Sequence, residues 1–163
     1  MTATSRARTG SVGRQPSKRR LRLWIRLLRT ARAIETELRE RLRVEFATTL
    51  PQFDVMAALA RANAGMTMGE LSRFLMVSNG NVTGIIDRLV THKLVMRKAP
   101  ADDRRAIIVR LTAKGASHFL QIAKAHEGWV DALLSDFDST ESEAMIQHLD
   151  GLATRIRNGG SRA

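Results

Sequence analysis

Residues 78–89 carry side chains that can hydrogen-bond to the edges of DNA bases. Val82 marks the buried side of a predicted helix, and polar residues fall on the opposite face of its helical wheel. Asparagine pairs bidentately with adenine and arginine with guanine, so Asn81 and Arg88 are the candidate base readers. The other residues of this predicted DNA-contact face are Asn79, Gly80, Thr83, Gly84 and Asp87. The spacing predicts a helix face that enters the major groove.

Hydroxyl and glycine residues at the start of this helix predict contacts with the DNA backbone. Ser78 and Thr83 can bind phosphate oxygens, which positions a protein without reading sequence, although Ser78 can equally be only a helix cap. Gly80 and Gly84 each weaken a helix by about 1 kcal/mol relative to Ala, a cost that is explained if DNA approaches the backbone closely. The alternative is that both glycines relieve crowding against a neighbouring helix.

A polar segment from Ala99 to Arg105 separates two runs of alternating apolar residues and predicts the tip of a β-hairpin. An arginine at such a tip, Arg104 or Arg105, can enter the minor groove, where narrow A·T-rich DNA concentrates negative potential. Asp103 can hold the tip in shape. The alternative is a solvated charged tip, and the helices predicted before the hairpin favour the DNA-contact interpretation.

Helical periodicity predicts two helices ahead of this region. A long helix runs from Leu21 to about Phe46, and its apolar stripe consists of Trp24, Leu27, Leu28, Ala31, Ile34, Leu38 and Leu42. Thr48 or Thr49 caps a second helix, with Pro51 in its first turn and its end near residues 63–65. The predicted buried side of the second helix consists of Phe53, Val55, Met56, Leu59 and Ala60.

Two short helices follow almost without a gap. Thr67 and Glu70 form a capping box for a helix that ends at Leu75. Ser78 caps the next helix, which runs to about His92. Two helices of this length with a short turn between them are typical of a helix-turn-helix.

The apolar period then changes from helical to two, which predicts the two strands of a wing. Leu94 and Met96 mark the first strand, and Ile107, Val109 and Leu111 mark the second.

Two further helices complete the chain. Thr112 caps one that runs to about Leu134. Thr140 and Glu143 form a capping box for a last helix that reaches Arg157 and stops at residues 158–160.

Composition indicates one basic domain with a polar arm. The chain has 163 residues, 27 Lys and Arg against 16 Asp and Glu, and a net charge of +11, which favours polyanionic partners. Residues 1–20 contain six basic and no acidic residues and almost nothing apolar, so we expect a disordered arm there.

Residues 21–163 form one domain, divided into a dimerisation helix (21–46), a winged helix-turn-helix (47–111) and C-terminal dimerisation helices (112–158). No window approaches a membrane span, and a reducing cytoplasm fits a chain without cysteine.

The residue types needed for catalysis or metal binding are not arranged for either purpose. The absence of cysteine excludes disulfides, thiolate metal sites and cysteine nucleophiles. The four histidines, His92, His118, His126 and His148, form no metal motif and stand beside no evident nucleophile or carboxylate pair. We therefore expect no enzymatic activity, no metal and no cofactor.

Three features, spread from about Leu21 to Arg157, resemble the MarR family of winged-helix regulators. Residues 78–89 resemble the family's serine, threonine and leucine spacing, and residues 103–115 are similar to its Asp-x-Arg tip, alternating strand and Leu-Thr-x-x-Gly. The third feature is a long helix before, and two helices after, the winged domain. The family often has Gly just before the strand, where this chain has His92 and Lys93.

The resemblance implies a mainly α fold, with a winged helix-turn-helix flanked by N- and C-terminal helices that intertwine in a homodimer. It favours Arg105 over Arg104 as the minor-groove residue. In the family, effectors bind between the dimer helices and the winged domain. Candidate effector contacts there are Trp24, Arg26, His126 and Trp129, and the ligand is expected to be an aromatic acid or its coenzyme A thioester.

Together these features predict a sequence-specific regulator, mainly a repressor, that binds double-stranded DNA at a roughly palindromic operator. A small aromatic or anionic effector is expected to release it, and no membrane partner is expected. The alternative is a nonspecific architectural DNA-binding or membrane-surface protein driven by its basic arm. Removing the arm separates the two, because a regulator keeps its sequence preference and an arm-driven binder loses nearly all affinity.

Overall fold

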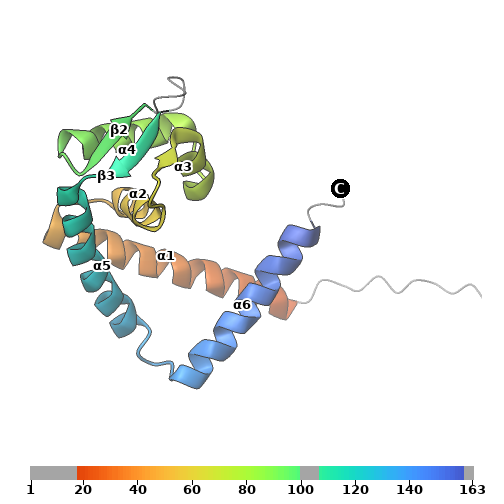
Figure 1. Cartoon of the computed structure of the whole chain (residues 1–163). Coiled ribbons are helices and arrows are strands. Elements are labelled where there is room, and N and C mark those ends of the chain that lie inside the picture. The colour runs from red at the N-terminus through yellow and green to blue at the C-terminus, as the bar shows by residue number, and fades with distance from the viewer. Residues whose placement is uncertain (1–17, 100–106, 160–163) are drawn as a thin grey trace, which may run out of the picture. The chain divides into compact units, whose positions relative to one another are not determined.

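The computed structural model describes residues 18–99 and 107–159 (Figure 1). The chain divides into two compact units at Thr36, so that residues 18–36 and 37–159 are described separately. Of the predicted arm, residues 1–17 lie outside the described part. Residues 18–20 are helical, because the first helix, α1 (Lys18–Phe46), begins three residues before its predicted start.

Helix α1 buries only part of its predicted apolar stripe. Leu38 and Leu42 are buried, whereas Trp24 is 58% exposed and Ala31 is also exposed. The remaining stripe residues, Leu27, Leu28 and Ile34, are half-buried. Periodicity predicts an apolar face, but burial depends on what covers it.

Helix α2 (Leu50–Arg61) begins at a capping box that sequence analysis predicted only in part. Thr49 is the N-cap, and its backbone N–H donates to the side-chain oxygen of Gln52 at 3.0 Å. Gln52 is itself 8% exposed. The prediction that Ala60 is buried is wrong, because Ala60 is exposed and Ala58 is the buried alanine of this helix.

The helix-turn-helix is confirmed. Helix α3 (Met68–Leu75) starts at the Thr67–Glu70 capping box, and helix α4 (Asn79–Thr91) starts at Ser78, whose hydroxyl accepts from the Asn81 amide. Between them Met76 adopts a left-handed conformation with φ 53°. The hydroxyl of Ser72 donates to the carbonyl of Val77 at 2.6 Å, which closes this turn.

A small antiparallel sheet forms the wing (Figure 1). Strands β2 (Val95–Lys98) and β3 (Ile108–Leu111) pair antiparallel, as predicted for the wing, and the structure places Arg97 opposite Val109. A third strand, β1 (Met66–Thr67), pairs with β3 and was not predicted, because two residues are too few to show a period. The prediction that Leu94 and Met96 mark the apolar positions of the first strand was also wrong. Val95 is buried, and Met96 is 45% exposed.

The turn before β2 explains that error. Lys93 adopts φ 58°, in the left-handed region where the MarR family often has Gly. Leu94 is held outside the strand, because its N–H donates to the Leu89 carbonyl and its carbonyl accepts from the Thr112 N–H. Leu94 is therefore buried as part of the turn, and the alternation of the strand starts at Val95.

Helix α5 (Ala113–Leu133) begins at its predicted cap, where the Thr112 hydroxyl accepts from the Gly115 N–H at 2.9 Å. The predicted capping box of the last helix, α6 (Ser139–Gly159), is wrong. Asp138 and Glu141 form it instead, since the Asp138 carboxylate accepts from the Thr140 and Glu141 amides. No residue of α6 is buried. Among the described residues, no helix combines the length and apolar character needed to cross a bilayer.

Candidate nucleic-acid interface

One side of α4 is anchored in the core and the other is open. Val82, Ile86 and Leu89 are buried, with at most 1% exposure each. The predicted DNA-contact residues of this helix and its cap are all exposed, namely Ser78, Asn79, Gly80, Asn81, Thr83, Gly84, Asp87 and Arg88. The fold thus brings the whole predicted contact face of α4 to the surface.

The two glycines of α4 face open space. A Cβ atom added to Gly80 or Gly84 meets nothing within 4 Å. The alternative that these glycines relieve crowding against a neighbouring helix therefore finds no support in the described chain. Two glycines at exposed positions lower the stability of helix α4. Because no contact within the described chain explains them, a partner that approaches this face is the better explanation.

The hydroxyls predicted to contact phosphate are engaged within the helix. Thr83 donates to the carbonyl of Asn79 at 3.0 Å. Ser78 accepts from the Asn81 amide at 3.4 Å, so it does serve as a cap. A Ser or Thr oxygen has further capacity, since one hydroxyl can donate and accept at once.

An ion pair joins α4 to the wing. The carboxylate of Asp87 lies 2.6 Å from the guanidinium of Arg97 on β2. Sequence analysis placed Asp87 on the contact face but missed Arg97, and no local pattern links two residues in different elements. The pair couples the orientation of α4 to the first strand of the wing.

A tight contact also fixes the wing against α5. A Cβ on Gly115 would lie 1.8 Å from the Leu94 carbonyl oxygen, so only glycine fits at this position. The Thr112 hydroxyl donates to the Lys93 carbonyl at 2.7 Å. The Leu-Thr-x-x-Gly segment therefore holds the start of β2 against the first turn of α5.

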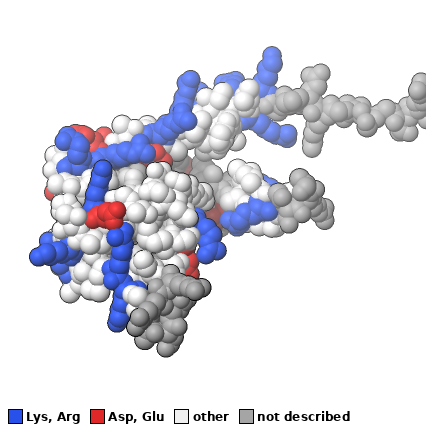
Figure 2. Space-filling view, turned by 90° about the horizontal axis from the view of Figure 1, so that it is seen from above, with Lys and Arg blue, Asp and Glu red and all other residues white. Residues whose placement is uncertain are grey.

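The charge of this region favours a polyanion. Residues 66–98 hold five Lys and Arg, namely Arg73, Arg88, Lys93, Arg97 and Lys98, against the acids Glu70 and Asp87. Seen from above, blue side chains are spread over the winged part of the molecule and red ones are few (Figure 2). The predicted tip residues, Asp103, Arg104 and Arg105, lie outside the described residues.

Two of the four candidate effector contacts belong to one aromatic cluster. His126 stacks on Phe53 with ring centroids 4.6 Å apart, and Trp129 lies 6.4 Å from His126 and 6.0 Å from Phe46. Burial lowers the pKa of His126 below its ordinary value. Trp129 is 9% exposed, so most of its surface is already covered by the protein.

The other two candidates, Trp24 and Arg26, are exposed on α1 within residues 18–36. Within the described ranges, no group of three His, Cys, Asp or Glu side chains is placed to hold a metal ion.

Comparison with known proteins agrees with this architecture. A sequence profile of the MarR family matches residues 48–106. The chain is 28% identical over 152 residues to the transcriptional activatory protein BadR of Rhodopseudomonas palustris, covering 91% of this chain and 86% of that protein.

Two solved structures are similar over most of the chain. A MarR family transcriptional regulator from Silicibacter pomeroyi is 32% identical, with a TM-score of 0.72, covering 86% of this chain and 99% of that one. A mutant of Escherichia coli MarR complexed with operator DNA is 25% identical, with a TM-score of 0.71, covering 82% and 95%. The helix-turn-helix, the wing and this similarity together show that the chain belongs to the MarR family of transcriptional regulators.

Proposed function

We propose that the protein binds DNA sequence-specifically through the exposed face of α4. The observation that carries this proposal is that the contact face is polar and open, with two glycines whose missing side chains leave free space. The similar E. coli MarR mutant is complexed with operator DNA, which supports the same use of the fold here.

Asn81 and Arg88 are proposed to read base edges in the major groove. Gly80 and Gly84 let the DNA backbone come close, and Ser78 and Thr83 contact phosphate. Asp87 acts mainly through Arg97, since their ion pair already occupies its carboxylate. Arg105 is proposed to enter the minor groove, with Asp103 shaping the tip.

The active form is proposed to be a homodimer. Helix α6 exposes an apolar face at a helical spacing, made of Met145, Ile146, Leu149, Leu152 and Ile156, each at least 41% exposed. Leu21, Leu23 and Trp24 of α1 are each at least 58% exposed. Apolar faces of this kind mark interaction sites, and a second copy of the chain supplies the same faces.

A two-fold dimer carries two copies of α4, so its operator is roughly palindromic, with recognition helices about 34 Å apart. Occupancy of such an operator is proposed to repress neighbouring genes until a small aromatic or anionic effector releases the protein. The relative BadR carries an activator's name, so the sign of regulation is decided by measuring transcription with and without the protein.

The test is selection of bound sequences from random duplex DNA at physiological salt. Wild type is compared with an Asn81→Ala, Arg88→Ala double variant, and we expect wild type to enrich a two-fold symmetric site that the variant loses or relaxes. The matched control is Asn63→Ala with Arg61→Ala, which removes the same two residue types from exposed positions at the last residue of α2 and in the turn that follows it. Equal enrichment by wild type and the α4 variant would contradict the assignment of the readers.

A further inference from the structure

Most of the positive charge of the chain precedes the winged domain in the sequence. Residues 1–36 contain 10 Lys and Arg and one acidic residue, whereas residues 37–163 contain 17 Lys and Arg and 15 acidic residues. Nine of the eleven net positive charges therefore belong to the first 36 residues. The rest of the chain is nearly neutral because residues 127–150 contain seven acidic residues and no Lys or Arg. The unit that carries α4 thus has little net charge with which to attract DNA.

In the described part of the chain, this positive charge is gathered on one side of α1. Lys18, Arg22, Arg26 and Arg29 follow one another at steps of four, four and three residues, which places them on one side of the helix. All four side chains are exposed. These four residues form the basic face of α1. In Figure 2, blue side chains lie on the segment that adjoins the long grey trace.

The opposite side of the same segment is apolar. Leu23, Trp24 and Leu27 lie there, away from Arg22 and Arg29. Leu23 and Trp24 belong to the apolar surface that a second copy of the chain is proposed to cover. A homodimer built on that surface leaves the basic face open to another partner.

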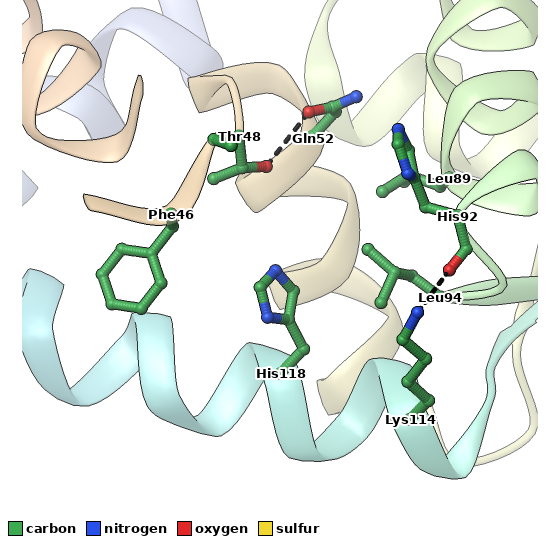
Figure 3. A pocket seen from close by; sticks show the side chains of 9 residues that line it. Phe46, Thr48, Gln52, Leu89, His92, Leu94, Lys114 and His118 are labelled. Atoms are coloured by element: carbon green, nitrogen blue, oxygen red, sulfur yellow. Dashed lines mark hydrogen bonds between the residues drawn. The ribbon is translucent and has the colours of Figure 1, made fainter. Parts of the chain in front are cut away.

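The basic face has no counter-charge among the described residues. None of its four side chains takes part in a hydrogen bond or ion pair there. Basic residues of the winged part are engaged, by contrast, since Arg97 pairs with Asp87. The Lys114 ammonium likewise donates to the His92 carbonyl at 3.0 Å (Figure 3). Like charges four residues apart destabilise a helix, so an anionic partner stabilises this face.

We propose that the basic face of α1 binds the phosphate backbone of DNA and supplies sequence-independent affinity. This inference rests on the DNA-binding function proposed above and adds a second contact surface to the exposed face of α4. Arginine suits this role, because its guanidinium stays charged and forms bidentate hydrogen bonds with phosphate. The face extends about 16 Å from Lys18 to Arg29, a length that about five phosphates of one strand span.

An anionic membrane surface is the other partner that a basic amphipathic helix can meet. Such binding uses both sides of the helix, because the apolar side is buried among the lipids while the basic side meets the headgroups. The proposed homodimer already occupies Leu23 and Trp24. DNA needs only the charged side, so the observations favour DNA.

The test is the salt dependence of DNA binding by the full chain, measured by fluorescence anisotropy between about 50 and 200 mM salt. The two probes are the site recovered by the selection described above and a random-sequence duplex of equal length. The variant is Arg22→Gln with Arg26→Gln and Arg29→Gln, because Gln keeps a long side chain and a similar helix propensity. We expect the slope of log K against log salt to become shallower by about 2.7 for each bound chain, and the affinity for both probes to fall about tenfold or more.

A charge-retaining variant separates the charge from the side-chain identity. Arg22→Lys with Arg26→Lys and Arg29→Lys is expected to keep the wild-type slope. Circular dichroism and sedimentation verify that each variant keeps its helix content and its assembly. If the triple Gln variant loses its assembly, the single Arg→Gln variants carry the test, with an expected change in slope of about 0.9 each.

The matched control removes the same charge elsewhere. Arg61→Gln, Lys124→Gln and Arg155→Gln change exposed positions on α2, α5 and α6. We expect this control to leave the slope close to that of wild type, because counterions are released only where a charge meets phosphate. Equal changes in the control and the α1 variant would overturn the proposal, since net charge alone would then explain both.

Cosedimentation with vesicles that contain phosphatidylglycerol tests the membrane alternative. An α1 variant that loses vesicle binding but keeps the wild-type slope on DNA would overturn the proposal in favour of a membrane contact. The outcome for the proposed function is separate. If wild type enriches a site and the α1 variant shares its slope, this inference fails and sequence-specific binding stands. If wild type binds the random duplex without preference, the proposed function fails, and the change in slope still decides the role of α1.

Discussion

The Asp87 carboxylate and the Arg97 guanidinium lie 2.6 Å apart, so the recognition helix and the wing are joined by a side-chain ion pair. The two side chains are 54% and 34% exposed, respectively. An exposed pair of this kind contributes only about 0–1 kcal/mol to stability. Its main effect is therefore geometric, because it links α4 to strand β2 of the wing, the two elements that we propose contact DNA.

Breaking this pair is expected to affect DNA binding more than folding. Asp87→Ala and Arg97→Ala should each lower the free energy of unfolding by about 1 kcal/mol or less, measured by urea denaturation. DNA affinity should fall in both, and the charge swap Asp87→Arg with Arg97→Asp should recover part of the loss in Asp87→Ala. Additive losses in a double-mutant cycle would show that the two residues act independently.

Gly84→Ala separates stability from DNA binding. The added methyl meets no atom within 4 Å, and Ala is the better helix former, so the free energy of unfolding should rise by about 1 kcal/mol. DNA affinity should fall because the methyl stands on the proposed contact face. Thermal unfolding and DNA-binding anisotropy are measured on the same sample, and unchanged affinity would place Gly84 outside the interface.

Gly115→Ala, unlike Gly84→Ala, should lower the free energy of unfolding. Its Cβ would lie 1.8 Å from the Leu94 carbonyl oxygen, which is backbone and cannot swing aside. We expect a loss of about 1–3 kcal/mol in the free energy of unfolding, typical of overpacking. Ala113→Gly, at an exposed position two residues earlier in α5, serves as the contrasting helix variant, with a loss of about 1 kcal/mol. A Gly115→Ala protein as stable as wild type would show that the turn at Leu94 yields easily.

Acid should destabilise the protein through the half-buried His126. Burial lowers the pKa of His126 in the folded state below the ordinary value of 6.5. The unfolded chain therefore takes up the proton first, so the stabilisation is present above about pH 6.5 and is lost as pH falls through the folded-state pKa. His126→Phe, which keeps a ring against Phe53, should reduce the drop in unfolding temperature between pH 7.5 and pH 5.5. An equal drop in both proteins would assign the pH dependence to other groups.

Removing residues 1–17 should test the role of the basic arm while leaving α1 whole. Those residues carry Arg6, Arg8 and Arg14, so the truncated protein should bind its operator more weakly and with a shallower salt dependence. Selection from random DNA should still recover the same site. Loss of nearly all binding, specific and nonspecific alike, would support the architectural alternative.

Local signals in the sequence were enough to predict most of the elements. Thr67 with Glu70, Ser78 and Thr112 each cap a helix at the predicted residue, because a cap depends on hydrogen bonds within three residues. The contact face of α4 could be predicted for a similar reason, since the buried residues of one helix define its opposite side. The last capping box was misplaced because Asp138 and Thr140 both satisfy the pattern, and only the structure shows which carboxylate reaches the amides.

Contacts between residues distant in sequence had to come from the tertiary structure. No spacing rule predicts that Arg97 meets Asp87, or that the Leu94 carbonyl leaves no room for a side chain at Gly115. These relationships arise where separate elements pack together, and their geometry depends on all of those elements at once. The sequence thus determined the helices and the exposed face of α4 that we propose contacts DNA, while the packing of α2, α4 and α5 decided how that face is held.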